Sequence, residues 1–165
     1  MTAIQNWLIS GKSMFKYRVF LDTNVLLDAL LGNVRPAYVA STSILQAAKQ
    51  GLLEVFITTQ SIVDASYICS RIPDYNDDSF NNAVKELLSF ANIGYISYFD
   101  LYRVLEARTG DFEDDAQFQH ADSLGCDALI TSDKVFRNSK RDTDMQFLSP
   151  EEFLAKMSER RWRKD

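Results

Sequence analysis

Aspartates that follow predicted strands are the side chains best placed for chemistry. Asp22 comes directly after the apolar run Tyr17 to Leu21, and Asp133 lies two residues beyond a run that ends at Thr131. Ligands of open parallel sheets bind beyond the carboxyl ends of the strands, so we expect both carboxylates to face one crevice. The alternative is that each aspartate only caps a helix or closes a turn, which is the commonest use of Asp after a strand.

A further carboxylate, Asp114, stands near the start of a predicted helix. It shares a helical stripe with residues typical of a core-facing side: Phe118, Ala121 and Gly125. A carboxylate on a buried stripe needs a cation or a hydrogen-bond donor. Asp115 falls on the polar face with Gln119 and Asp122, so the pattern favours Asp114 over Asp115 as the functional acid. The alternative for Asp114 is an acidic residue that only complements the helix dipole.

Other titratable residues are open to more than one interpretation. Asp64 lies one to two turns into the helix predicted after the second strand, where it either pairs with Arg71 or serves a functional site. Asp28 is predicted to lie on a solvated helix face. His120 is interpreted as structural and not catalytic.

The composition limits the chemistry available. The chain has 165 residues, 46% of them hydrophobic, which suits one folded domain. Its single histidine excludes an HExxH zinc site, and Cys69 and Cys126 lack metal-ligand spacing, so both are expected to be free, buried thiols. The net charge of −5 is not the footprint of a dedicated DNA-binding protein. Any catalysis is therefore expected to depend on carboxylates and a hard metal.

Several aspartates in one crevice resist joint ionisation unless a cation lies among them. Mg²⁺ or Mn²⁺ prefers carboxylate and water ligands, acidifies bound water and stabilises charge on a phosphoryl group, which suits phosphodiester hydrolysis. Basic residues near Asp133 are candidates to hold the phosphate backbone of RNA: Lys134, Arg137, Lys140 and Arg141. Phe136 and Trp162 are candidates for stacking on bases.

Short apolar strands alternate with amphipathic helices along the chain. Strands are predicted over 17–21, 53–57, 95–98, 128–131 and 145–148. Helices are predicted over about 25–30, 36–50, 59–71, 79–91, 100–108, 111–125 and from 150 onward. Thr58 or Thr59 is expected to cap the third helix, and Ser149 to open the last with a capping box.

This order predicts an α/β fold, a single domain with a mostly parallel central sheet flanked by helices. The domain is expected to span 17–156, between an N-terminal extension (1–16) and a basic tail (157–165). No apolar run reaches the roughly 18 residues of a membrane span, and no secretory signal is evident. A cytoplasmic protein without membrane contact is therefore expected.

Segments of the chain, taken in order, resemble the PIN-domain family. FLDTNVLLDALL (20–31) is similar to the opening of PIN domains, and DFEDDAQFQHADSLGCDALITSD (111–133) to their second half. FLSPEEFL (147–154) resembles the close of one bacterial branch. The resemblance covers about residues 17–156. It implies a PIN-like three-layer sandwich and an Mg²⁺- or Mn²⁺-dependent ribonuclease, many relatives being VapC-like toxins of toxin–antitoxin pairs.

The same resemblance implies roles for individual residues. Three aspartates are implied to coordinate the metal and activate water: Asp22, Asp114 and Asp133. Asp64 stands where the family usually has Glu, and it is implied to complete the metal shell or orient the water. Asn24 and Thr131 are implied to hydrogen-bond the carboxylates. The implied partners are RNA, a small antitoxin protein and a second copy of the chain in a homodimer.

Two alternatives of other classes are open. One is a degenerate PIN module that binds RNA or a protein partner without cleavage, which the shorter Asp64 side chain and the acidic net charge favour. The other is a phosphatase of the haloacid dehalogenase type, because Asp22-Thr23-Asn24 follows a strand. Asn24 matches that second family poorly, and no motif places its lysine.

Overall fold

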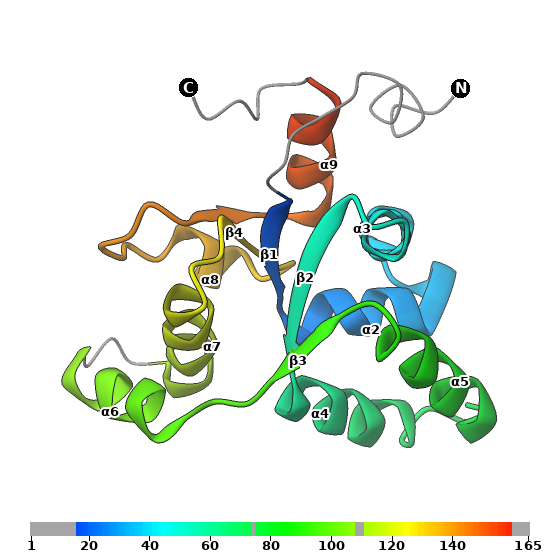
Figure 1. Ribbon diagram of the computed structural model, residues 1–165. Coiled ribbons are helices and arrows are strands. Elements are labelled where there is room, and N and C mark those ends of the chain that lie inside the picture. Colours follow the sequence, from blue (N-terminus) through cyan, green and yellow to red (C-terminus); the bar gives the residue numbers. More distant parts are fainter. Residues whose placement is uncertain (1–15, 74, 108–110, 160–165) are drawn as a thin grey trace.

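The computed structural model of the chain describes residues 16–73, 75–107 and 111–159 (Figure 1). Its centre is one sheet of five strands in the order β3-β2-β1-β4-β5. The strands are β1 (Tyr17–Leu21), β2 (Leu53–Thr58), β3 (Asn92–Gly94), β4 (Ala128–Ile130) and β5 (Gln146–Leu148). Every pair of neighbours is parallel, so all carboxyl ends lie at one edge of the sheet. The predicted α/β fold with a parallel sheet is confirmed.

Helices cover both faces of the sheet and make a three-layer sandwich (Figure 1). They are α2 (Thr23–Leu31), α3 (Tyr38–Lys49), α4 (Thr59–Cys69), α5 (Asp77–Leu87), α6 (Tyr98–Ala107), α7 (Phe112–Ser123), α8 (Lys134–Asn138) and α9 (Pro150–Ser158). A short 3-10 turn, η1 (Gly32–Val34), follows α2. None of the described helices is long and apolar enough to cross a membrane.

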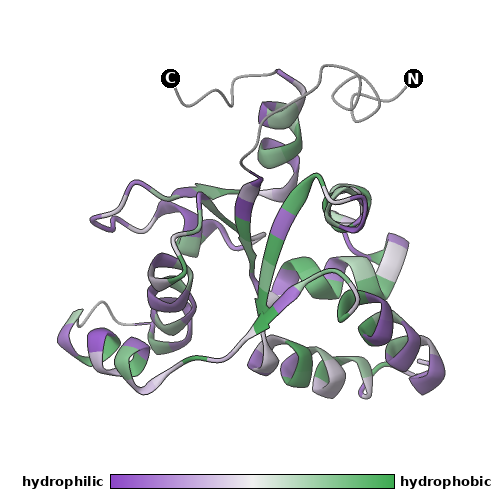
Figure 2. Cartoon of the chain, in the orientation of Figure 1, coloured by the Kyte–Doolittle hydropathy of each residue, from purple (hydrophilic) through white to green (hydrophobic). Residues whose placement is uncertain are grey.

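The alternation of side chains along β1 divides the core into two parts. Val19 and Leu21 point toward α2, α3, α4 and α9, in the larger cluster of buried apolar residues. Phe20 points to the opposite face, where it packs with Phe118 of α7 and Phe136 of α8. Figure 2 shows hydrophobic residues concentrated along the strands and α2, and hydrophilic ones over much of α5. Both cysteines are free and buried, as predicted.

Helix starts agree with the sequence where a capping residue is present. Thr58 caps α4 by accepting from the Ser61 N–H, and Ser149 and Glu152 form the predicted capping box of α9. The second predicted helix begins at Tyr38 and not at Pro36. The short helix α8 was not predicted. The last helix continues to Ser158, beyond the predicted domain limit, while residues 1–15 and the tail from 160 onward, including Trp162, lie outside the described residues.

The strand predicted over 95–98 is wrong. The strand lies earlier, at Asn92–Gly94, and α6 already begins at Tyr98. A reciprocal cap explains the helix start: the Asp100 carboxylate accepts from the Ser97 N–H at 2.8 Å, and the Asp100 N–H donates to the Ser97 hydroxyl at 3.2 Å. The sequence had indicated Asp100 as the N-cap of this helix. In the structure Asp100 lies in the first turn of α6 instead.

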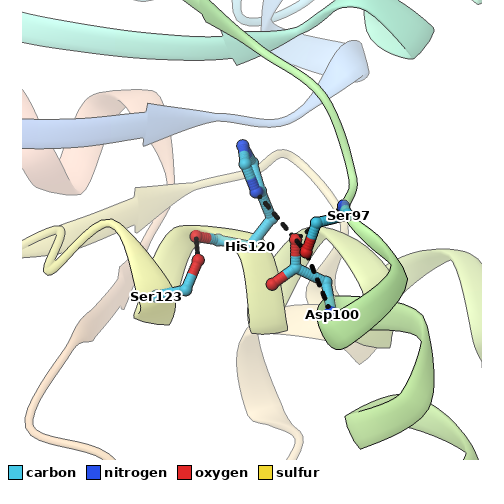
Figure 3. A network of polar contacts seen from close by, with 4 residues as sticks. All are labelled: Ser97, Asp100, His120 and Ser123. Carbon is cyan, nitrogen blue, oxygen red and sulfur yellow. Dashed lines mark hydrogen bonds and ion pairs between the residues drawn. The ribbon is translucent and has the colours of Figure 1, made fainter.

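The buried pair His120–Asp100 joins α6 to α7 (Figure 3). His120 Nδ1 lies 3.0 Å from the Asp100 carboxylate, which also holds the Ser97 hydroxyl at 2.9 Å. Burial alone would raise the pKa of Asp100, but the hydrogen bonds from the Ser97 N–H and hydroxyl, together with His120, lower this pKa below its ordinary value. His120 thus fixes one helix on another, in agreement with its structural interpretation.

Candidate metal centre

Asp22 lies at the carboxyl end of β1 and is only 4% exposed. Its backbone N–H donates to the Ile130 carbonyl of β4 at 3.0 Å, which holds Asp22 between the two central strands. Its Oδ2 accepts from the Thr131 hydroxyl at 2.7 Å and from the Asn24 side-chain amide at 3.2 Å. Asp22 occupies the N-cap position of α2 without making a side-chain cap bond, so helix capping does not explain this buried carboxylate.

Thr131 connects Asp22 to Asp133. The fully buried Thr131 hydroxyl donates to Asp22 and accepts from the Asp133 N–H at 2.9 Å. Asp133 is exposed, and its Oδ1 caps α8 by accepting from the Val135 N–H at 2.6 Å and the Phe136 N–H at 3.1 Å. The capping alternative therefore holds for one oxygen of Asp133, and the cap fixes the orientation of this carboxylate at the same sheet edge.

Asp114 is half-buried in the first turn of α7, where its N–H is bound by the N-cap carboxylate of Asp111 at 3.1 Å. Burial, followed by the negative charges of Asp111, Asp22 and Asp133, raises the pKa of Asp114 to about 7, against an opposing effect of Arg141. Asp22 and Asp133 are thus close enough to act on Asp114 electrostatically. Asp22 after β1, Asp114 on α7 and Asp133 after β4 therefore form one acidic environment.

Glu113 is an acid that the sequence interpretation missed. Glu113 is exposed at the start of α7, yet partial desolvation raises its pKa, and the charges of Asp64, Asp22 and Asp111 raise the pKa further. Glu113 therefore stands on α7 within electrostatic reach of both Asp22 and Asp64. The only sequence signal was its place in the acidic run before Asp114, and that signal does not distinguish a site residue from a solvated helix start.

Asp64 is half-exposed on α4 and accepts from the Gln60 side-chain amide at 2.8 Å. The Arg71 guanidinium lies over the Tyr67 ring, 4.2 Å from its centroid, and no ion pair joins it to Asp64 among the described residues. The ion-pair alternative for Asp64 is therefore wrong. The negative charge of Asp64 contributes to the raised pKa of Glu113, so the two carboxylates lie within electrostatic reach of each other.

The position predicted for Asp115 on a polar helix face is wrong. Asp115 is 2% exposed and pairs with Arg141 at 2.6 Å. The segment after α8 covers this side of α7, and α6 covers another, so residues 115–121 are all buried and the helix has no solvated face there. Asp115 is a structural acid, and Asp114 beside it faces the acidic environment.

The basic residues near Asp133 differ in their surroundings. The Arg141 side chain is 7% exposed and lies over the rings of Phe118, Phe136 and Phe147, so the expectation that it binds RNA is wrong. Phe136 is itself buried and unavailable to stack on a base. Arg137 pairs with Glu152 at 2.7 Å, whereas Lys134 and Lys140 are exposed. These two lysines are the accessible members of the group.

Asp28 was expected on a solvated face and is instead 2% exposed. It pairs with Arg35 at 2.8 Å, which the sequence pattern did not indicate because Arg35 lies beyond the end of α2. The helix is covered on that side by α3.

The acids were compared with the requirements of a metal ion. Within residues 16–73, 75–107 and 111–159, no three His, Cys, Asp or Glu side chains lie close enough together to hold a metal ion as they stand. The donor chemistry fits a hard divalent cation, because the acids are carboxylates. Burial, and after it the charges of neighbouring acids, raises the pKa of Asp114 and of Glu113. A cation among them would offset those negative charges.

Comparisons with known proteins agree with this architecture. A family profile described as "PIN domain" matches residues 18–135. The solved structure of VapC20 from Mycobacterium tuberculosis, described as a sarcin-ricin loop cleaving toxin, superposes with a TM-score of 0.57 at 12% identity, over 72% of this chain and 92% of that one. PAE2754 from Pyrobaculum aerophilum superposes with a TM-score of 0.62 at 16% identity, over 87% and 91%. No curated protein sequence matches.

Proposed function

The chain belongs to the PIN-domain family, and from that membership we propose that it is a metal-dependent endoribonuclease that hydrolyses RNA phosphodiester bonds. The observation that carries the proposal is the Thr131 hydroxyl, which donates to the Asp22 carboxylate and accepts from the Asp133 N–H. The raised pKa of Asp114, to which the charges of Asp22 and Asp133 contribute after burial, supports placing Asp114 near them. Membership in this family replaces the phosphatase alternative. Neither the substrate nor the metal follows from the fold by itself.

In the proposed mechanism, Asp22, Asp114 and Asp133 would hold one or more Mg²⁺ or Mn²⁺ ions. The bound metal would acidify a water molecule and neutralise charge on the scissile phosphate. Thr131 and Asn24 orient the Asp22 carboxylate through their hydrogen bonds to Oδ2.

Asp64 and Asp22 both lie close enough to Glu113 for their charges to raise its pKa. We assign to Glu113 and Asp64 the part that the family usually gives to one glutamate on the helix after the second strand. Asp64, on α4, has a shorter side chain than Glu, and Glu113 lies in the first turn of α7. Lys134, which follows Asp133 in the sequence, and Lys140, which lies after α8, are both exposed and are proposed to contact the RNA phosphates.

A place in a toxin–antitoxin pair extends the proposal. It is supported by the likeness in fold to VapC20, which is described as a toxin that cleaves the sarcin-ricin loop. The proposed partners are RNA, a small antitoxin protein and a second copy of the chain, and the proposed location is the cytoplasm. Arrested growth on expression in bacterial cells, absent for Asp22→Asn, is the expected sign of a toxin.

The nuclease proposal is tested by incubating the purified chain with a mixed RNA pool in Mn²⁺, in Mg²⁺ and with a chelator. Asp22→Asn and Asp114→Asn are each expected to reduce cleavage by about 100-fold or more, because each removes a metal ligand. Asp142→Asn is the matched control, an exposed aspartate outside the acidic environment, and it is expected to cleave like the wild type. Cleavage that continues in the presence of the chelator, or that is retained in both the Asp22→Asn and the Asp114→Asn variant, would refute the proposed mechanism.

A PIN module that binds RNA or a protein without cleavage is the second candidate. Two observations favour it: Asp64 stands where the family usually has Glu, and the described acids do not form a three-ligand cluster as they stand. It predicts retention of RNA by the wild type with no cleavage in any metal. In that case Asp22→Asn is expected to leave binding unchanged.

A further inference from the structure

The buried carboxylate of Asp28 joins three segments that are distant in sequence. Its Oδ1 accepts from Arg35 Nε at 2.8 Å, in the segment that follows η1. Its Oδ2 accepts from the Ser132 hydroxyl at 2.9 Å and from the Ser41 hydroxyl of α3 at 3.4 Å. An unpaired carboxylate at this depth would be strongly destabilising, so these partners account for its presence in the core.

Ser132 is the residue between Thr131 and Asp133, in the segment that carries two of the proposed site residues. Thr131 is fixed by its N–H bond to the Leu148 carbonyl of β5 at 3.0 Å and by its hydroxyl bond to Asp22. Asp133 is fixed by its N–H bond to Thr131 and by capping α8. The bond from Ser132 to Asp28 anchors the middle of this short segment to α2, the helix that begins next to Asp22.

Asp28 and Asp22 lie on the same helix, Asp22 at its N-cap and Asp28 nearer its end. The segment 131–133 therefore contacts α2 at two points, through Thr131 to Asp22 and through Ser132 to Asp28. Two contacts to one rigid helix restrict rotation of the segment more than one contact does. The distance between the Asp22 and Asp133 carboxylates depends on that rotation.

We propose that Asp28, oriented by Arg35, is a positioning residue that uses Ser132 to hold Thr131 and Asp133 in register with Asp22. The ion pair with Arg35 fixes the orientation of the Asp28 carboxylate, and that carboxylate fixes the position of residues 131–133. The catalytic part of this role rests on the proposed nuclease function. The positioning part concerns the segment itself and is measurable without activity.

The chain offers a matched pair of variants for the test. Ser132→Ala and Ser41→Ala each remove one hydroxyl from the same oxygen of Asp28, but only Ser132 belongs to the site segment. Both leave the Arg35 ion pair, so both are expected to fold. Ser132→Thr retains the hydroxyl and is the rescue variant. Asp28→Asn tests the same connection from the other end.

The first readout is amide hydrogen exchange in metal-free protein. Ser132→Ala is expected to accelerate exchange over residues 131–136 by about 10-fold, with Ser41→Ala and Ser132→Thr close to wild type. The second readout is RNA cleavage at varied Mn²⁺. Ser132→Ala is expected to lower kcat by about 10-fold and to raise the Mn²⁺ concentration needed for half-maximal rate, with the KM for RNA within about twofold.

The outcomes test the positioning role of Asp28 and the proposed nuclease function separately. Equal exchange in Ser132→Ala and Ser41→Ala overturns the positioning role, whatever the activity. Faster exchange with an unchanged kcat and Mn²⁺ requirement also overturns it, because Asp28 would then only stabilise the fold. A wild type that cuts no RNA refutes the nuclease proposal, and exchange together with Mn²⁺ binding by calorimetry then decides the positioning role alone.

Discussion

Asp114 and Asp115 are adjacent on α7 and have opposite surroundings. Asp114 faces Asp22, Asp133 and Asp111, whose charges add to burial in raising its pKa to about 7. Asp115 points into the protein, where Arg141 pairs with it. A helix turns about 100° per residue, so consecutive side chains reach different environments. Substitution of each carboxylate by its amide is therefore expected to give contrasting results.

Asp114→Asn is expected to stabilise the metal-free protein at neutral pH. The folded-state pKa of about 7 lies above the ordinary value of 3.8, so the contribution of Asp114 to stability is fully present below about pH 4 and is lost as the pH rises through 7. The loss is on the order of 2 kcal/mol after allowance for partial exposure. Urea unfolding with a chelator at pH 4 and pH 8 measures it. An identical pH dependence in wild type and Asp114→Asn would contradict the shift.

Asp115→Asn is expected to destabilise the protein, in contrast to Asp114→Asn. Removal of one partner from a buried ion pair leaves Arg141 uncompensated and costs about 3 kcal/mol of unfolding free energy. Cleavage per folded molecule is expected to stay within about threefold of wild type, because Asp115 does not face the acidic environment. Urea unfolding and an RNA cleavage assay on the same preparation check both halves. A stable but inactive Asp115→Asn would mean that Asp115, and not Asp114, is the functional acid.

Glu113→Gln is the third prediction at this scale. If Glu113 shares the acidic environment of Asp22 and Asp64, its amide variant is expected to cleave RNA about 10-fold more slowly. Glu106→Gln, on the exposed surface of α6, is the control that keeps wild-type activity. Equal rates for the two variants would remove Glu113 from the proposed site.

At the scale of elements, the sequence predicted most helices and strands because their caps are local. Thr58 and the Ser149–Glu152 box each lie within four residues of the helix they start. The strand near Gly94 was misplaced for a related reason: the Ser97–Asp100 cap was not recognised, and β3 takes its position from pairing with β2, which is not visible locally. The burial of α7 on its polar side depends on a later segment and could not be predicted from helix periodicity.

Gly94 lies where β3 passes the His120 side chain. A Cβ at this position would be 2.5 Å from His120 Nε2, and His120 is held in place by Asp100. Gly94→Ala is expected to cost about 2 kcal/mol of unfolding free energy, because neither group moves freely in a packed interior. In a His120→Ala background the same substitution is expected to cost less. Equal costs in both backgrounds would mean that the contact does not limit this position.

At the scale of the whole molecule, the site combines residues from both ends of the domain. The order of strands predicted that Asp22 and Asp133 would lie at one edge, because parallel strands place their carboxyl ends together. Asp114 was added from its helical stripe and from the resemblance to the PIN-domain family. Glu113 and the burial of Asp28 could not be predicted, since each depends on contacts between elements far apart in sequence. The assignment of Arg141 to RNA failed for the same reason.

Divalent metal is expected to stabilise the entire fold. The chain carries a net charge of −5, and part of this charge is concentrated among carboxylates that repel one another. Mn²⁺ at about 100 times its Kd adds about 2.7 kcal/mol and raises the Tm by several degrees. Asp22→Asn is expected to show little of this shift in a thermal melt, and Asp142→Asn all of it. If the wild-type Tm does not change with Mn²⁺, the acidic residues do not bind this metal.

The first strand along the chain is the middle strand of the sheet, and this order has a consequence during synthesis. The carboxylate of Asp22 is made early, but its partner Thr131 follows 109 residues later and β5 later still. The acidic site cannot form while those segments are still inside the ribosome, because domains fold as units once their strands have emerged. If the chain cuts RNA, each nascent copy is harmless to the ribosome that makes it until nearly all of the domain has been translated.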